Sequence, residues 1–188
     1  KEDGVFAGLC KESFPLLPME EEGRLNDPWL RENFIMQIFA YHDFENFKAS
    51  SPDMKALVDF HQSYKFMLQS KNDIAYRKLG KLVGSHDKQN TAELFVEYER
   101  TFKTTIGEKS SIGKTRNVLE HMAGFVKNDL SEIEKSTLHE QIRDYAAKII
   151  PLVTPLSTLS MFANKYDASY LLGQKFLQPY PKELALRS

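Results

Sequence analysis

The chain has 188 residues, of which 41% are hydrophobic and 27% are charged, so it is long enough to bury the core of one domain. Its 13 Phe and 8 Tyr exclude a disordered chain, and no apolar run reaches the roughly 20 residues that span a bilayer. The net charge of −1 divides into −6 for residues 1–47, +5 for 48–127 and 0 for 128–188, so the middle segment suits either an anionic partner or a solvated lysine-rich face.

The first 26 residues show no sustained helical period. Pro15 and Pro18 disfavour helix at the residues before them, and the three glutamates at 20–22 suit a solvated linker. We expect residues 1–26 to be an extended linker or the tail of a preceding domain, and 27–188 to form one domain. Because the chain opens at Lys1 rather than Met, we also expect further residues upstream.

From Asn26 onwards, apolar residues recur at helical spacing, and capping residues or prolines open most of the segments. Ser131 with Glu134 forms a predicted capping box. The predicted helices cover 28–42, 52–68, 72–83, 91–102, 118–126, 131–149 and 156–162, with a short eighth capped by Asp167. No segment alternates with a period of two. We therefore predict an all-α fold, an irregular bundle of about seven to eight helices with an extended N-terminal segment.

The tripeptide Gly-Lys-Thr at 113–115 suggests a phosphate-binding loop. The Walker pattern would require glycine where Glu108 stands, and a strand where the chain is predicted helical, so nucleotide hydrolysis is excluded. Lys109, Lys114 and Arg116 nevertheless surround a helix N-terminus, where free N–H groups and the helix dipole attract phosphate. This segment is either a phosphate contact or a mobile surface loop.

Three side chains, His61, Tyr64 and Lys65, share one face of the second predicted helix. An imidazole, a phenol and an ammonium together can bind phosphate or stack on a base. The same spacing also suits a buried, hydrogen-bonded network at the edge of the core.

Cations also gather in the third predicted helix, where Arg77 and Lys81 share a face and Lys78 lies beside them. The planar fork of arginine suits phosphate. Gly80 in the same helix costs about 1 kcal/mol relative to alanine. Close approach of a neighbouring helix, or of RNA, would explain that glycine.

A polar face in the fifth predicted helix holds Asn117, His121 and Gly124 at spacings of four and three. We interpret it as a buried network at a helix crossing, with ligand contact as the alternative. No two of the five histidines have the i, i+4 spacing of a helical zinc site, and the only cysteine is Cys10, so no metal site is expected. A lone cysteine also excludes an internal disulfide and favours a reducing, cytoplasmic setting.

Several of these motifs, taken in order, resemble the YbgA-like family of bacterial proteins, over roughly residues 34–187. The segments that carry the resemblance are FHQSYK at 60–65, YRKLG at 76–80, NVLEHMAGF at 117–125 and QKFLQPYP at 174–181. Tyr64 departs from the family, which often has a second histidine at that position.

Residues 1–33 are similar to the end of a thiouracil-desulfidase-like domain, through GVFAGL at 4–9 and EEEGRLND at 20–27. The resemblance implies an upstream enzyme domain that removes sulfur from thiolated uracil, including 4-thiouridine in tRNA. It also implies an iron–sulfur cluster on three upstream cysteines, none of which Cys10 matches. We therefore expect no cofactor and assign no catalytic residue in this chain.

Together these observations predict a tRNA-binding helical module that presents RNA to a desulfidase domain, with no membrane partner. The predicted phosphate contacts are Lys65, Arg77, Lys78, Lys81, Lys114 and Arg116. The residues predicted to shape the site or touch a base are His61, Tyr64, Asn117 and His121. One alternative is a structural or protein-interaction module that does not bind RNA. The other is a small-molecule enzyme with a deep pocket lined by those last four side chains.

Overall fold

The computed structural model describes residues 4–85 and 90–184, and all regular structure in these ranges is helical. The α-helices are α1 (Val5–Ser13), α2 (Pro28–Ala49), α3 (Met54–Ser63), α4 (Lys65–Lys71), α5 (Asp73–Gly84), α6 (Thr91–Gly107), α7 (Ile112–Val126), α8 (Glu132–Ala146), α9 (Val153–Lys165) and α10 (Ser169–Leu172). Two 3-10 helices, η1 (Glu22–Asn26) and η3 (Lys182–Leu184), complete the described elements. The all-α class is confirmed, but the predicted count of seven to eight is too low for the ten α-helices seen in this part of the chain.

Two local features explain why more α-helices form than were predicted. The predicted helix over 52–68 is two helices, α3 and α4, because Tyr64 between them has a φ of −94° and a ψ of 2°. Helix α1 forms where an extended segment was predicted, since Val5–Ser13 holds no proline that would prevent helix. None of its residues is buried, so it shows no core-facing period in the sequence.

Helix boundaries follow the capping chemistry in most places. The capping box of Ser131 and Glu134 is present at the start of α8, as predicted. The same helix ends three residues earlier than predicted, before Lys148, which has a φ of 62°, and Ile149 is exposed. The prediction that Asp167 caps the last short helix is wrong, because Ala168 is the N-cap of α10 and no side chain caps it.

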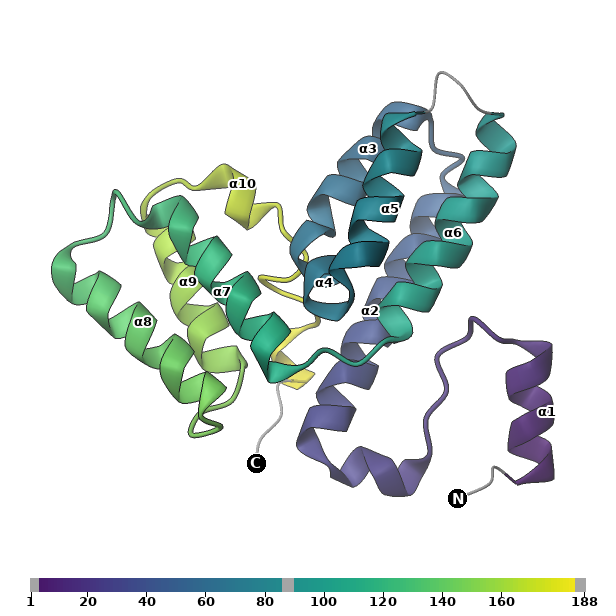
Figure 1. Ribbon diagram of the computed structural model, residues 1–188, viewed down its shortest axis with the longest axis horizontal. Coiled ribbons are helices and arrows are strands. Elements are labelled where there is room, and N and C mark those ends of the chain that lie inside the picture. Colours follow the sequence, from purple (N-terminus) through teal and green to yellow (C-terminus); the bar gives the residue numbers. More distant parts are fainter. Residues whose placement is uncertain (1–3, 86–89, 185–188) are drawn as a thin grey trace.

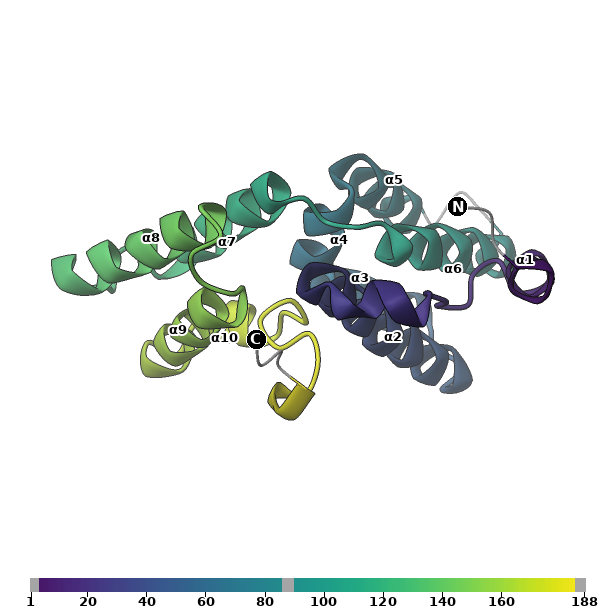
Figure 2. The same ribbon diagram turned by 90° about the horizontal axis from the view of Figure 1, so that it is seen from below.

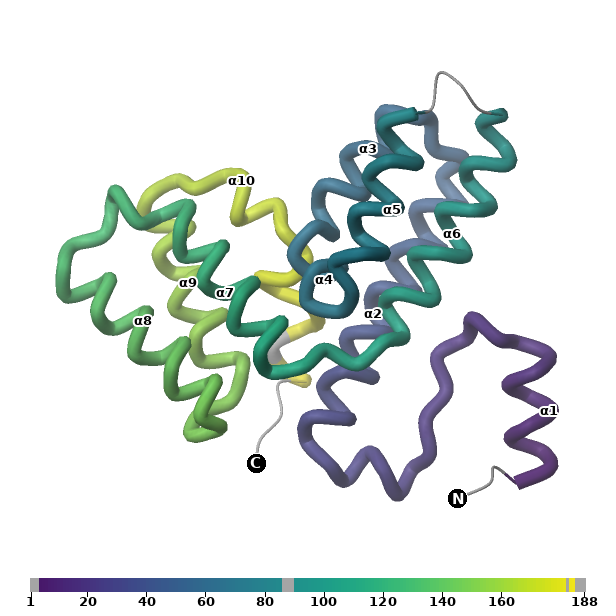
Figure 3. Tube along the Cα trace, viewed as in Figure 1, coloured from purple at the N-terminus to yellow at the C-terminus, as the bar shows by residue number. Residues whose placement is uncertain are grey.

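The helices form two groups joined at α4. Figure 1 shows α2, α3, α5 and α6 together on one side, and α7, α8 and α9 on the other. The groups also stay apart in the view turned by 90° (Figure 2). Helix α4 packs against α5 and α6 of one group and α7 of the other. The chain after α10 returns to the junction between the groups, as the yellow end of the tube shows (Figure 3).

The returning C-terminal segment holds the break between α3 and α4. The backbone N–H of Lys175 donates to the Ser63 carbonyl at 2.9 Å, and the Gln174 amide donates to the Gln62 carbonyl at 3.1 Å. The Lys175 ammonium also lies 2.6 Å from an Asp43 carboxylate oxygen. The break is therefore fixed from outside, and Lys65 begins α4 at the junction.

A buried polar cluster ties the other end of α4 to its neighbours. The Oδ1 atom of Asn33 accepts hydrogen bonds from the Lys71 ammonium at 2.6 Å and from the backbone N–H and hydroxyl of Ser110 at 3.0 and 2.9 Å. Lys71 is only 1% exposed, and burial lowers the pKa of its ammonium to about 7. One amide oxygen thus joins α2, α4 and the loop before α7.

Candidate nucleic-acid interface

Two of the residues predicted to shape the site, His61 and Tyr64, lie inside the protein. His61 Nδ1 shares a hydrogen bond of 3.1 Å with the buried Tyr98 hydroxyl, and its ring stacks on Tyr76 with centroids 5.3 Å apart. Burial lowers the pKa of His61 to about 4. The Tyr64 hydroxyl donates to Asp43 at 2.8 Å. Both side chains therefore form the buried network given as an alternative, and neither presents a surface to a base.

Gly80 in α5 lies beside the imidazole of His61. A Cβ added to Gly80 would meet only His61 Nε2, at 3.5 Å, which is an ordinary van der Waals distance. No neighbouring backbone approaches this glycine, so the predicted close helix crossing is absent here.

Replacing Gly80 by alanine is therefore expected to raise the free energy of unfolding by about 0.5–1 kcal/mol, because alanine has the higher helix propensity and fits the space. Urea denaturation of the full chain would measure the change. Gly124→Ala in α7 is the matched comparison, since no atom lies within 4 Å of its added Cβ. A gain at Gly124 together with a loss at Gly80 would contradict the prediction and show that the His61 ring requires the glycine.

Three of the six predicted phosphate contacts are paired with carboxylates. The pairs are Arg77 with Asp73, Lys78 with Glu97 and Arg116 with Glu120, at 2.8, 3.0 and 2.8 Å. All three pairs are solvent-exposed, and exposed pairs contribute little to stability. Their carboxylates nevertheless offset the positive charge that a phosphate would meet.

The other three predicted contacts, Lys65, Lys81 and Lys114, have no carboxylate partner within residues 4–85 and 90–184. The Lys114 ammonium donates to the Lys71 carbonyl at 2.6 Å, a contact with the C-terminus of α4 that leaves its full charge. Lys81 is exposed on α5. The uncompensated charge of the predicted set is therefore concentrated on these three lysines.

Helix α7 presents Lys114, His121 and Phe125 on one flank, because their spacings of seven and four residues keep them in register along a helix. This flank faces α4: Lys114 reaches the Lys71 carbonyl, and the Phe125 ring meets the Phe66 ring edge-on with centroids 6.0 Å apart. Arg116 is two residues from Lys114, about 200° round the helix, and so belongs to the opposite flank.

The face of Asn117, His121 and Gly124 was interpreted as a buried network, and the structure corrects this. All three residues are exposed. Since His61 and Tyr64 are buried in α3 and at its end, while Asn117 and His121 are exposed on α7, the four do not surround one pocket. The structure thus leaves Asn117 and His121 open to a ligand.

Sequence reasoning missed an aromatic group beside Lys65. Phe125 and Tyr170 stack with centroids 4.9 Å apart and an interplanar angle of 19°. The Lys65 ammonium lies 5.2, 6.0 and 5.8 Å from the ring centroids of Phe66, Phe125 and Tyr170. Phe125 lies in the helix predicted over 118–126, and 47% of it is exposed. Its position four residues after His121 was the available signal, because it continues the polar face rather than the core face.

We name the α4–α7 face for five residues: Lys65, Lys114, His121, Phe125 and Tyr170. Lys65 is at the first residue of α4, and Lys114 contacts the last. The two ends of α4 are six positions apart, which is about 9 Å along the helix axis. The face therefore carries a lysine at each end, with an imidazole on the flank between them and two aromatic rings beside Lys65.

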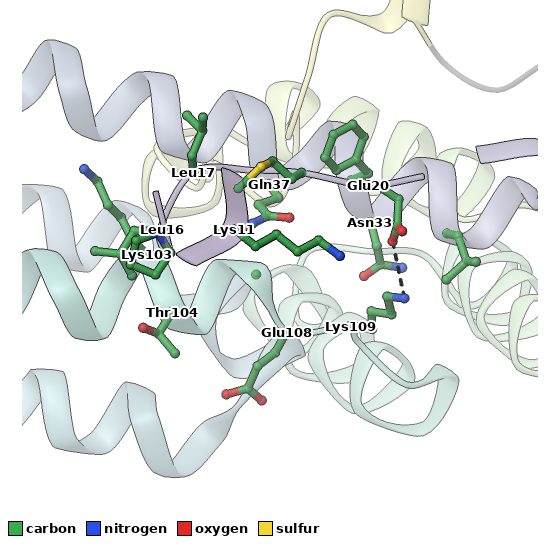
Figure 4. Close-up of a pocket in the computed structure, with 15 residues that line it drawn as sticks. Lys11, Leu16, Leu17, Glu20, Asn33, Gln37, Lys103, Thr104, Glu108 and Lys109 are labelled. Carbon is green, nitrogen blue, oxygen red and sulfur yellow. Dashed lines mark ion pairs between the residues drawn. The ribbon is translucent and has the colours of Figure 1, made fainter. Parts of the chain in front are cut away.

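A separate hollow lies between the N-terminal segment and helices α2 and α6 (Figure 4). Its volume is about 420 Å³, and its lining includes Lys11, Glu20, Asn33, Glu108 and Lys109. The Lys11 side chain extends through it, and Lys109 is 3.5 Å from Glu20 (Figure 4). None of the residues of the α4–α7 face lines this hollow.

Two kinds of feature are absent from the described ranges. No group of three or more His, Cys, Asp or Glu side chains is placed to hold a metal ion. No helix in these ranges has both the length and the apolar content that crossing a bilayer requires.

Comparison with known proteins places these residues within a matched region. A family described as "Protein of unknown function (DUF1722)" matches residues 65–181, which include all five residues of the α4–α7 face. The chain is 26% identical over 157 residues to the "Uncharacterized protein YbgA" of Escherichia coli K12, covering 83% of this chain and 93% of that protein. No solved structure matches.

Proposed function

The chain belongs to the DUF1722 family of proteins of unknown function, and from that premise we propose that it is a helical RNA-binding module. The observation that carries the proposal is the α4–α7 face, where Lys65 and Lys114 have no carboxylate partner among the described residues and flank exposed side chains that can contact bases. Phosphate contacts supply most of the affinity in such complexes, and aromatic rings add stacking.

The location of the proposed contacts differs from the original prediction. Asn117 and His121 are exposed, and Lys65 and Lys114 have no carboxylate partner in the described ranges, whereas Arg77, Lys78 and Arg116 would first exchange a carboxylate for a phosphate. His61 and Tyr64 would act only by fixing the helices that carry the face. The proposed surface is therefore narrower than the six predicted cations.

The resemblance of the N-terminal residues to a desulfidase tail suggests the wider setting. We propose thiolated tRNA as the RNA, and an upstream iron–sulfur desulfidase domain as the partner that acts on it. We also place the protein in the cytoplasm, where the lone Cys10 stays reduced. In this arrangement the helical module holds the RNA and contributes no catalytic residue.

Lys65→Gln and Lys114→Gln are each expected to weaken tRNA binding and to reduce the slope of log K against log salt by about 0.7–0.9, the contribution of one phosphate contact. Fluorescence anisotropy with labelled tRNA over a salt series would measure both quantities. Lys55→Gln is the matched control, because Lys55 is an exposed lysine on α3 with no partner in the described ranges. Affinities and slopes that stay equal to those of the control would remove the α4–α7 face from the proposal.

A second candidate function, docking of a protein partner, is favoured by α1. Val5, Phe6 and Leu9 on this helix are 83, 80 and 57% exposed, and no residue of α1 is buried. Apolar side chains that gather on one short exposed helix are typical of a protein-contact surface. Unchanged RNA binding in the lysine variants would leave this role as the better supported one.

A further inference from the structure

We propose that Phe125, Tyr170 and Lys65 form a stacking site for one unpaired RNA base, an inference that rests on the proposed function. It assigns the ligand class of the α4–α7 face: RNA with a base outside the duplex, in a loop, a bulge or a flipped-out state.

Phe125 remains partly exposed although other side chains pack against it. Phe66, Tyr170 and Lys65 already lie against its ring, yet 47% of the residue remains exposed. Its neighbour Tyr170 is nearly parallel to it and stacks on one of its faces, so a base would stack on the opposite face of the Phe125 ring. The face of an aromatic ring accepts any base, because every base has a π-face.

Lys65 places a positive charge beside these rings. Its ammonium lies within 6.0 Å of three ring centroids and has no carboxylate partner in the described part of the chain. A nucleotide would bring its own phosphate next to the stacked base, within reach of this ammonium. Lys65 would thus contact the phosphate of one nucleotide, while the aromatic rings stack on its base.

Polar side chains precede Phe125 along α7. His121 precedes Phe125 by one helical turn, and Asn117 precedes His121 by another, and both are exposed. An imidazole and an amide can hydrogen-bond the edge of a base that is not paired. At the end of α4 away from Lys65, the Asp73 carboxylate is held by Arg77 at 2.8 Å and by Gln69 at 3.4 Å.

A duplex would not satisfy this site. Bases within a duplex stack on each other, and the wide, shallow groove of an RNA helix shows base edges and hydroxyls rather than ring faces. A base must leave the stack before its face can meet Phe125. The site therefore distinguishes unpaired from paired RNA, whereas Lys65 and Lys114 alone would not.

Two RNA duplexes of separate strands with blunt ends, identical except for one bulged 2-aminopurine, test the proposal on the full chain. We expect the bulged duplex to bind about tenfold more tightly, within the range that stacking of one base provides. We also expect the 2-aminopurine fluorescence to fall on binding. Phe125→Leu and, separately, Tyr170→Leu should remove the fluorescence change, and each should lower the affinity for the bulged duplex more than the affinity for the fully paired duplex. Phe14→Leu is the matched control, because Phe14 is 60% exposed outside the α4–α7 face.

The possible results separate the two claims. If both duplexes bind equally and the leucine variants change nothing, the stacking site is overturned and the RNA-binding function remains. If neither duplex binds at any salt concentration, both are overturned. The unfolding midpoint of each variant is measured alongside, and agreement between Phe125→Leu and Tyr170→Leu shows that a lost preference comes from the rings rather than from misfolding of one variant.

Discussion

Replacing Asn33 by alanine is expected to lower the free energy of unfolding by about 3–5 kcal/mol. The substitution removes the oxygen that accepts from the Lys71 ammonium and from both donors of Ser110, and the amide that donates to the Trp29 carbonyl. The buried Lys71 ammonium would then lose a hydrogen-bond acceptor. Removing only one partner of a buried charged contact is strongly destabilising, because the charge stays buried without that partner. Chemical denaturation of the full chain measures the loss.

Asn164→Ala provides the matched control. Its amide also donates to the backbone carbonyl four residues earlier, at 2.8 Å, but on the exposed side of α9. We expect that change to stay within about 0.5 kcal/mol. The effect of Asn33→Ala should also shrink in a Lys71→Met background, since methionine fills the space without a charge. A full-size loss in that background would show that the cost does not come from the ammonium.

The second large effect concerns His61 and acid. Burial lowers the pKa of His61 from 6.5 to about 4, so below pH 6.5 the unfolded chain takes up a proton that the folded chain refuses. Stability contributed by this residue is therefore complete above pH 6.5 and is lost as the pH falls to 4. The loss amounts to about 3 kcal/mol over that window.

His61→Gln isolates this contribution, because glutamine keeps a polar partner for the Tyr98 hydroxyl and does not titrate. The difference in unfolding free energy between wild type and variant, measured at several pH values from 4 to 7.5, should change by the full amount. Burial raises the pKa of Glu32, which acts with the opposite sign in both proteins and cancels in the difference. His139→Gln, on the exposed side of α8, is the control. A difference that does not vary with pH would contradict the buried, neutral imidazole.

Helix positions were largely predictable from the chain alone. Periodicity and capping residues identified the helices from Pro28 onwards, because each buries an apolar stripe against a neighbour. Helix α1 could not be found in this way, since it buries nothing. The break at Tyr64 also carries no local signal, because the C-terminal segment more than 100 residues later holds it in place.

The candidate site was also predictable only in part from the sequence. Residue types and helical spacing placed Lys65, Lys114, Asn117 and His121 among the candidates. They did not show that Arg77, Lys78 and Arg116 meet carboxylates, because the partner of Lys78 lies on a different helix and every pair depends on side-chain geometry. They did not reveal Phe125 with Tyr170 either, since the two rings are 45 residues apart in the sequence and are brought together only by packing.

By itself the sequence determined the helical class, most helix positions and the residues able to contact an anion, because these follow from local propensity and from spacing along one helix. Burial and mutual distance across the molecule were decided only by the tertiary structure. It placed His61 inside and Phe125 outside, although both follow helical spacing, because the side on which a helix meets its neighbours depends on how the whole chain packs.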